Sequence, residues 1–342
     1  MIALYSDIQR LHDPQFFLSS GAQKPCPEKP ARIDALLQGL DKLGIQPQEP
    51  QDHGPDAIAA IHPERYLTFL QTIHTRWSRI DGASAEVIPN IHPASRPNSF
   101  TPGYPLSAVG QAGFHMADAS CPIGPHTWAA AYASAQAAIH GAELLLQGQT
   151  AAYALCRPPG HHAFADLAGG FCYLNNTAIA AQQLTLQGRK TAILDIDLHH
   201  GNGTQGIFYD RPDVLTVSLH AHPERCYPFF WGYPEERGHA AGQGANLNLT
   251  MERGTGDAGF QRHLGTALQT ISDWQADTLV LALGLDAFVG DPFAGLAVTT
   301  QGFAEIGRSI HSLNLPSLIV QEGGYLCAEL GDNLAAVLKA WT

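Results

Sequence analysis

The chain has 342 residues, a formal net charge of −12 at pH 7 and a hydrophobic fraction of 45%. This length allows one large α/β domain, and the few lysines and arginines are too scattered to predict a nucleic-acid partner. Residues 1–13 lack the features of a signal peptide and no stretch reaches the ~20 apolar residues of a membrane span, so we expect a cytoplasmic protein with no membrane partner.

Residues 78–126 form a long segment that is rich in Pro, Gly, Ser and His and shows no sustained period. Inside a compact domain, a segment of this length without regular structure is usually functional. We therefore expect it to act as a lid, a binding loop or an oligomer contact.

Apolar runs alternate with helix-like stretches from about residue 128 onward. The predicted strands cover residues 151–157, 191–197, 214–220, 245–251, 278–286 and 317–324. The predicted helices cover residues 127–148, 175–188, 260–275 and 302–314. Because the strands are apolar along nearly their whole length, they should be buried on both faces, which predicts a mostly parallel central sheet flanked by helices. No repeat or long linker divides the chain, so we expect a single α/β domain over residues 1–342.

Reactive residue types follow four of the predicted strands. The sequence leads from these strands into RPPGHHAF, DIDLHHGNG, GLDAF and EGGY. In open parallel sheets, the chemistry gathers at the carboxyl ends of the strands. These four strand ends should therefore face one cavity.

The stretch LDIDLHHGNG combines carboxylates and imidazoles at metal-ligand spacing. Asp195, Asp197 and His199 share one side if the strand continues that far, whereas His200 points away. Asp286, at the end of its own strand, is the best candidate for a third ligand. Two carboxylates and one imidazole leave an open position on a divalent metal, as a catalytic site requires. The alternative is that Asp197 and His199 bind no metal and merely cap the following turn.

Two histidines and a tyrosine could supply proton transfer beside such a metal. His161 and His162 follow a tight Pro-Pro-Gly turn, and adjacent side chains diverge too far to act as joint ligands. They are better placed as acid-base groups. Tyr325, after two glycines, could donate to a developing oxyanion, although a tyrosine at such a position is more often packing.

The motifs RPPGHH, GGFCYLNN, DIDLHHGNGTQ, SLH, GLDAFVGDP and EGGY, in this order, resemble the histone deacetylase superfamily. The stretch PEKPARI at residues 27–33 is similar to the N-terminal motif of that superfamily. Chain length, Asn202 and the long segment before residue 128 resemble the bacterial acetylpolyamine amidohydrolases most. The resemblance implies an arginase-like and deacetylase-like α/β fold with Zn²⁺ held by Asp197, His199 and Asp286. The same ligands would accept Fe²⁺ or Co²⁺.

The resemblance also implies roles for the acid-base residues. His162 would be the general base and then the general acid, with His161 as its electrostatic neighbour and Tyr325 as the donor to the substrate carbonyl. Asp195 would hydrogen-bond His161, while Asn202 would stand beside His162. Because an anionic partner favours imidazolium and a neutral amide does not, we expect His161 to be the cation and His162 the neutral base.

Further positions follow from the same resemblance. A structural K⁺ would be held by Asp195, Ser218 and the carbonyls of Asp197, His199 and Leu219, and a second K⁺ by the carbonyls of Phe208, Arg211 and Val214. Phe171 and Tyr227 would line the acyl-lysine tunnel, where Gly169 and Gly170 let the wall approach closely. Asp118 is the candidate for binding a distal ammonium group of the substrate, with a solvated loop carboxylate as the alternative.

The resulting prediction is a metal-dependent deacetylase for acetylated polyamines or small diamines of the acetylputrescine and acetylcadaverine type. It would release acetate and a free amine. A protein acetyl-lysine deacetylase or a longer-chain deacylase shares every catalytic residue and stays open as an alternative. A non-catalytic acyl-amine binding module is disfavoured, because it would not need metal ligands and an oxyanion donor together. A dinuclear manganese hydrolase is disfavoured because the ligand set supplies one metal.

Overall fold

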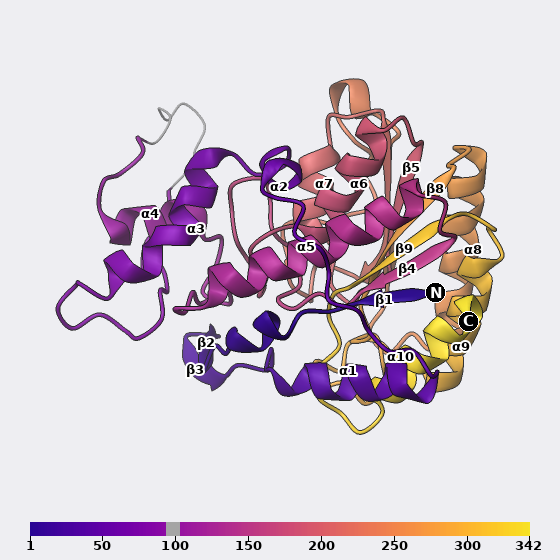
Figure 1. Ribbon diagram of the computed structural model, residues 1–342, viewed down its shortest axis with the longest axis horizontal. Helices are drawn as coiled ribbons and strands as arrows, with labels where there is room; N and C mark the ends of the chain where they lie inside the picture. Colours follow the sequence, from indigo (N-terminus) through magenta and orange to yellow (C-terminus); the bar gives the residue numbers. More distant parts are fainter. Residues whose placement is uncertain (94–102) are drawn as a thin grey trace.

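A seven-stranded parallel sheet forms the centre of the computed structural model, which describes residues 1–93 and 103–342 (Figure 1). In spatial order the strands are β1 (Ile2–Leu4), β4 (Ala151–Ala154), β9 (Ser317–Gln321), β8 (Thr278–Leu283), β5 (Thr191–Asp195), β6 (Val214–Ala221) and β7 (Asn246–Met251). Every neighbouring pair in this sheet is parallel. The predicted mostly parallel sheet is confirmed, and all six predicted strands are present, although several end earlier than expected.

Helices cover both faces of the sheet (Figure 1). The α-helices are α1 (Ala31–Lys42), α2 (Asp56–Ala59), α3 (Glu64–Trp77), α4 (Ala108–His115), α5 (Thr127–Leu146), α6 (Asn176–Leu186), α7 (Asn202–Phe208), α8 (Asp257–Asp273), α9 (Thr300–His311) and α10 (Leu330–Leu338). Short 3-10 helices cover Asp7–Leu11, Ala240–Gly242 and Lys339–Trp341. In the part of the chain that the structure describes, no helix is long and apolar enough to cross a membrane.

Side-chain alternation along the strands divides the core into two apolar layers. Ile319 of β9 packs into the layer with α1, α8, α9 and α10, whereas Leu318 and Val320 pack into the layer with α3, α5 and α6. Because both faces are buried, the strands carry nearly continuous apolar sequence, which is the pattern that predicted them. The four strands that end in reactive residues, β4, β9, β8 and β5, are direct neighbours in the sheet, so their carboxyl ends open at one edge.

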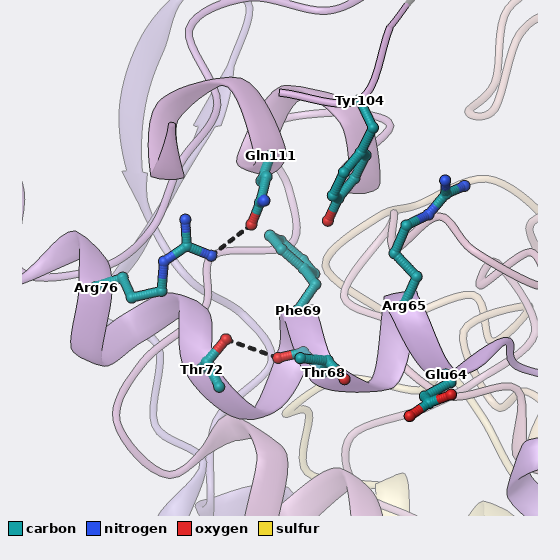
Figure 2. A pocket seen from close by; sticks show the side chains of 8 residues that line it. All are labelled: Glu64, Arg65, Thr68, Phe69, Thr72, Arg76, Tyr104 and Gln111. Atoms are coloured by element: carbon teal, nitrogen blue, oxygen red, sulfur yellow. Dashed lines mark hydrogen bonds between the residues drawn. The ribbon is translucent and has the colours of Figure 1, made fainter. Parts of the chain in front are cut away.

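The elements without a strong sequence signal lie mostly before residue 128. They include β1, α1, α3 and an antiparallel hairpin of β2 (Phe16–Ser19) and β3 (Ala22–Pro25). The segment 78–126 also contains α4, where we expected no regular structure; residues 94–102 of that segment lie outside the described residues. A cavity of about 350 Å³ lies between α3 and α4, where Arg76 donates to Gln111 beside Phe69 and Tyr104 (Figure 2).

Candidate active site

The loop after β5 places the metal-ligand candidates by backbone capping. The strand ends at Asp195, two residues before the predicted end at residue 197, so strand alternation does not reach His199. Instead, Asp195 Oδ1 accepts a hydrogen bond from the Asp197 N–H at 3.0 Å, and Asp197 Oδ1 accepts one from the His199 N–H at 2.9 Å. Each aspartate thus caps the backbone two residues onward, which folds the chain tightly at the edge of the sheet.

Asp197, His199 and Asp286 converge on one point, although Asp286 follows a different strand. His199 Nδ1 lies 3.2 Å from Asp197 Oδ1 and 3.0 Å from Asp286 Oδ2. One potential ligand atom from each residue lies within 4.8 Å of the others, and all three residues are buried. The Leu198 N–H donates to Asp286 Oδ1 at 2.9 Å, which ties the two strand ends together.

The surroundings of these three residues fit a divalent cation. A Cβ at Gly323 would overlap Asp197 Oδ2 and lie 2.6 Å from Asp286 Oδ2, so only glycine leaves the space beside both carboxylates open. Burial, together with the neighbouring Asp197, raises the pKa of Asp286 to about 7. Buried carboxylates this close together need a compensating positive charge, and Asp, His and Asp side chains are suitable ligands for Zn²⁺.

His161 lies on the turn between β4 and α6 and pairs with Asp195. Its Nδ1 donates to Asp195 Oδ2 at 2.9 Å, and its backbone N–H donates to Glu322 Oε2 at 3.1 Å. Burial opposes protonation of the ring, but the carboxylates of Asp195 and Asp197 outweigh burial and raise the pKa of His161 to about 10. At neutral pH, His161 is therefore an imidazolium.

His162 has a different environment, although its ring centroid lies only 4.0 Å from that of His161. Its Nδ1 donates to Asn202 Oδ1 at 2.7 Å, and Asn202 is the first residue of α7. Burial and the neighbouring His161 and His199 lower the pKa of His162 well below its usual value. His162 is thus a neutral imidazole with Nδ1 occupied, which leaves Nε2 as the acceptor.

Tyr325 is held by residues to which we assigned no role from the sequence. Asp291 Oδ2 accepts a hydrogen bond from the Tyr325 N–H at 2.8 Å, and the Arg32 guanidinium lies 4.9 Å from the centre of the tyrosine ring. Arg32 also donates to the carbonyl oxygens of Gly324 at 2.6 Å and Glu322 at 2.7 Å. Arg32 belongs to the PEKPARI motif, which was the signal that could have identified it.

A third buried partner completes the support under Tyr325. Glu28, from the same motif, binds Arg32 at 2.7 Å and lies 2.9 Å from the guanidinium of Arg157. The Glu322 carboxylate accepts the N–H groups of Gly160 and His161, so it couples the end of β9 to the histidine turn. These contacts join three distant parts of the chain, which explains why local spacing could not reveal them.

A cavity of about 510 Å³ leads from the surface to His162, His199 and Tyr325. Its walls include Phe171, Tyr227 and Phe293, together with the exposed aromatic residues 229–231. The ring of Tyr227 meets that of His162 at 4.9 Å and nearly perpendicular. A Cβ at Gly170, whose φ is +50°, would overlap the His162 ring, so this wall requires glycine. Gly169 and Asp118 lie beside the same wall.

The two groups of potassium candidates involve different parts of β6, one near its start at Val214 and the other around Ser218 and Leu219. Asp195 is paired with Ser218 in the register of β5 and β6, and Leu219 follows directly. Ser218 Oγ lies 2.8 Å from His220 Nδ1. Phe208, Arg211 and Val214 lie in the connection from α7 to β6, where the Phe208 carbonyl accepts the Arg211 N–H at 3.0 Å.

Known proteins are similar to this chain in sequence. Residues 26–341 match the family described as histone deacetylase domain. The chain is 44% identical over 334 residues to an acetylpolyamine amidohydrolase of Burkholderia pseudomallei, covering 97% of this chain and 96% of that protein. It is 40% identical over 343 residues to acetylpolyamine amidohydrolase 1 of Pseudomonas aeruginosa, covering 100% and 99%.

A solved structure extends this similarity to three dimensions. The crystal structure of acetylpolyamine aminohydrolase from Burkholderia pseudomallei matches with a TM-score of 0.94 at 43% identity, over 100% of this chain and 98% of that one. The deacetylase-like fold expected from the sequence motifs is therefore confirmed.

Proposed function

The chain belongs to the histone deacetylase domain family, and from this membership we propose that it is a metal-dependent hydrolase that deacetylates acetylated polyamines or small diamines. Acetylputrescine and acetylcadaverine are the proposed substrates, and acetate and the free amine are the products. The observation that supports this most directly is the convergence of Asp197, His199 and Asp286 beside His162 and Tyr325 at the base of one cavity.

Asp197, His199 and Asp286 would hold Zn²⁺, with Fe²⁺ or Co²⁺ as substitutes. Such an ion lowers the pKa of water and polarises an amide carbonyl. The protein groups around it do the remaining work. His162 Nε2 accepts a proton from the attacking water, because Nδ1 is occupied by Asn202. His162 then returns this proton to the nitrogen of the leaving amine.

Two fixed groups stabilise the charge that develops during attack. The Tyr325 hydroxyl donates to the oxygen of the former carbonyl from a buried position at the base of the cavity. Burial raises the pKa of this hydroxyl well above its usual value, so it stays protonated and able to donate. The His161 imidazolium adds a positive charge whose partner, Asp195, fixes its orientation.

The shape and charge of the protein support a small cationic substrate. The aromatic cavity walls suit the methylene chain of an acetylated amine, and the net charge of −12 favours the approach of cations. As further parts of this proposal, K⁺ binds at the two sites beside β6, and the segment 78–126 narrows the cavity mouth within a homodimer. The proposed location is the cytoplasm.

The pH profile should respond to the partner of His162. Asn202→Asp places an anion at the position of the amide oxygen, 2.7 Å from Nδ1, and an anion stabilises imidazolium. The pKa of His162 should rise, so that more of the base is protonated at low pH and the acidic limb of kcat/KM moves to higher pH. A kcat/KM profile that extends into the acidic range below pH 5 measures this shift. An unmoved limb would contradict the role of His162 as the base.

A substrate panel tests the proposed function itself. Acetylputrescine, acetylcadaverine, acetylspermidine and an acetyl-lysine peptide are compared on one metal-loaded preparation by release of acetate. We expect the small diamines to give the highest kcat/KM. Faster hydrolysis of the peptide would indicate a protein deacetylase, and binding without acetate release would indicate a non-catalytic binding module.

A further inference from the structure

Asp118 is joined to the tunnel wall by several backbone contacts. The Ala117 N–H donates to the carbonyl of Ala168 at 2.7 Å, next to the parallel bridge between Met116 and Ala168. The Ala119 carbonyl accepts the Leu18 N–H from the β2–β3 hairpin at 3.1 Å. The backbone around Asp118 is therefore connected to two walls of the cavity, and its side chain starts from a fixed position.

The Asp118 carboxylate is directed toward protein donors. Its Oδ1 accepts the Ser120 N–H at 2.7 Å. Its Oδ2 accepts the Tyr227 hydroxyl at 2.6 Å and the Gly170 N–H at 3.2 Å. Three donors from three parts of the chain thus share one carboxylate, and hydrogen bonds to an ionised acceptor are the stronger kind.

Tyr227 contacts Asp118 through its hydroxyl and the rings of His162 and His199 through its own ring. Its ring lies 4.9 Å from that of His162 and 6.2 Å from that of His199, in both cases edge to face. A tyrosine hydroxyl in an apolar wall requires a hydrogen-bond partner, and Asp118 provides one. Burial and Asp118 raise the pKa of Tyr227 well above its usual value, so the hydroxyl stays protonated and donates.

We infer that Asp118 is a positioning residue, which sets the inner wall of the tunnel through Tyr227 and Gly170 and does not bind the distal ammonium of the substrate. Among the described residues that line the cavity, Asp118 is the one carboxylate, and it is also the candidate from the sequence for binding the distal ammonium. The geometry gives it a different task, because both oxygens already accept hydrogen bonds from within the protein. This inference rests on the proposed deacetylase function.

The test uses Asp118→Asn, Tyr227→Phe and the double variant. Each is assayed on acetylputrescine and on N-pentylacetamide, which replaces the ammonium by a methyl group at equal length. Loss of a hydrogen bond to a charged group corresponds to a decrease in rate of roughly tenfold or more. We expect each single variant to lower kcat on both substrates by roughly this factor. The double variant should have a kcat no lower than that of Asp118→Asn alone, because both changes act on the same hydrogen bond between Tyr227 and Asp118.

Tyr132→Phe is the matched control. Tyr132 also donates to an aspartate, Asp52, at 2.7 Å, but on the exposed side of α5, so its variant should retain wild-type kcat. Two results would overturn the inference. The first is a higher KM of Asp118→Asn for acetylputrescine but not for N-pentylacetamide, together with an unchanged KM of Tyr227→Phe, which would make Asp118 a ligand of the ammonium group. The second is a loss of kcat in the double variant that equals the sum of the two single losses in free energy.

The outcomes separate this inference from the proposed function. If the wild-type enzyme cleaves neither substrate, the deacetylase proposal fails. The hydrogen bond between Asp118 and Tyr227 is then tested by thermal unfolding of the variants. Non-additive decreases in Tm for the Asp118 and Tyr227 variants support the positioning role, and additive decreases overturn it. If Asp118→Asn does not fold, Tyr227→Phe decides alone, because it keeps the ring and removes only the hydroxyl; an unchanged kcat overturns the inference.

Discussion

Asp286→Ala is expected to lower deacetylation by roughly a thousandfold or more, because electrophilic activation by a metal ion contributes several kcal/mol to catalysis. Asp286 supplies one of three converging ligand atoms and cannot be replaced by a neighbour, since the carboxylate of Asp197 is already part of the same group. Metal content, measured on the purified variant by elemental analysis, should fall together with activity. Asp332→Asn, which changes an exposed carboxylate paired with Lys42, is the control and should keep both.

Removal of the metal from wild-type protein should also lower its stability. A ligand that binds only the folded state contributes about 2.7 kcal/mol when its free concentration is 100 times Kd. Chelation should therefore decrease Tm, and added Zn²⁺ should restore Tm and activity together. The role of the three ligands would be contradicted if Asp286→Ala kept a full equivalent of metal and wild-type Tm.

His162→Ala is expected to lower kcat by about 10²–10⁴-fold, the range typical of a lost general acid-base group. The variant removes the neutral imidazole but keeps Asp197, His199 and Asp286, so metal content should stay at the wild-type level. The neighbouring His161 should not substitute for it, because Asp195 and Asp197 raise the pKa of His161 to about 10 and keep it protonated at neutral pH.

The pH dependence of the two histidine variants provides the control. His161→Ala removes a positive charge but leaves the base in place, so its acidic limb in kcat/KM should persist, whereas the limb should disappear in His162→Ala. Steady-state kinetics that extend into the acidic range below pH 5 measure both limbs. Wild-type kcat in His162→Ala would show that another group accepts the proton.

The sheet and the convergence of Asp197, His199 and Asp286 could be predicted from the sequence, because apolar strands and the residues that follow them give local signals. Apolar strands buried on both faces leave a nearly continuous hydrophobic run, as in β5 and β8, and reactive residues follow directly at their carboxyl ends. The placement of Asp286 beside Asp197 followed from the general rule for parallel sheets, and the order β4-β9-β8-β5 agrees with it. The first 127 residues carried weaker signals, since β1 has only three residues and β2–β3 is largely exposed.

Sequence patterns were sufficient to predict the fold class, the family and the set of residues that converge at the strand ends. How those residues are held in place depends on contacts that form only in the folded protein. Asp195 caps a turn where the strand was expected to continue, Glu322 and Arg32 reach the site from distant segments, and Asp118 bonds to Tyr227 across 109 positions of the chain. Hydrogen bonds between such distant residues leave no periodic pattern in the sequence, because they depend on how packed elements approach one another in space.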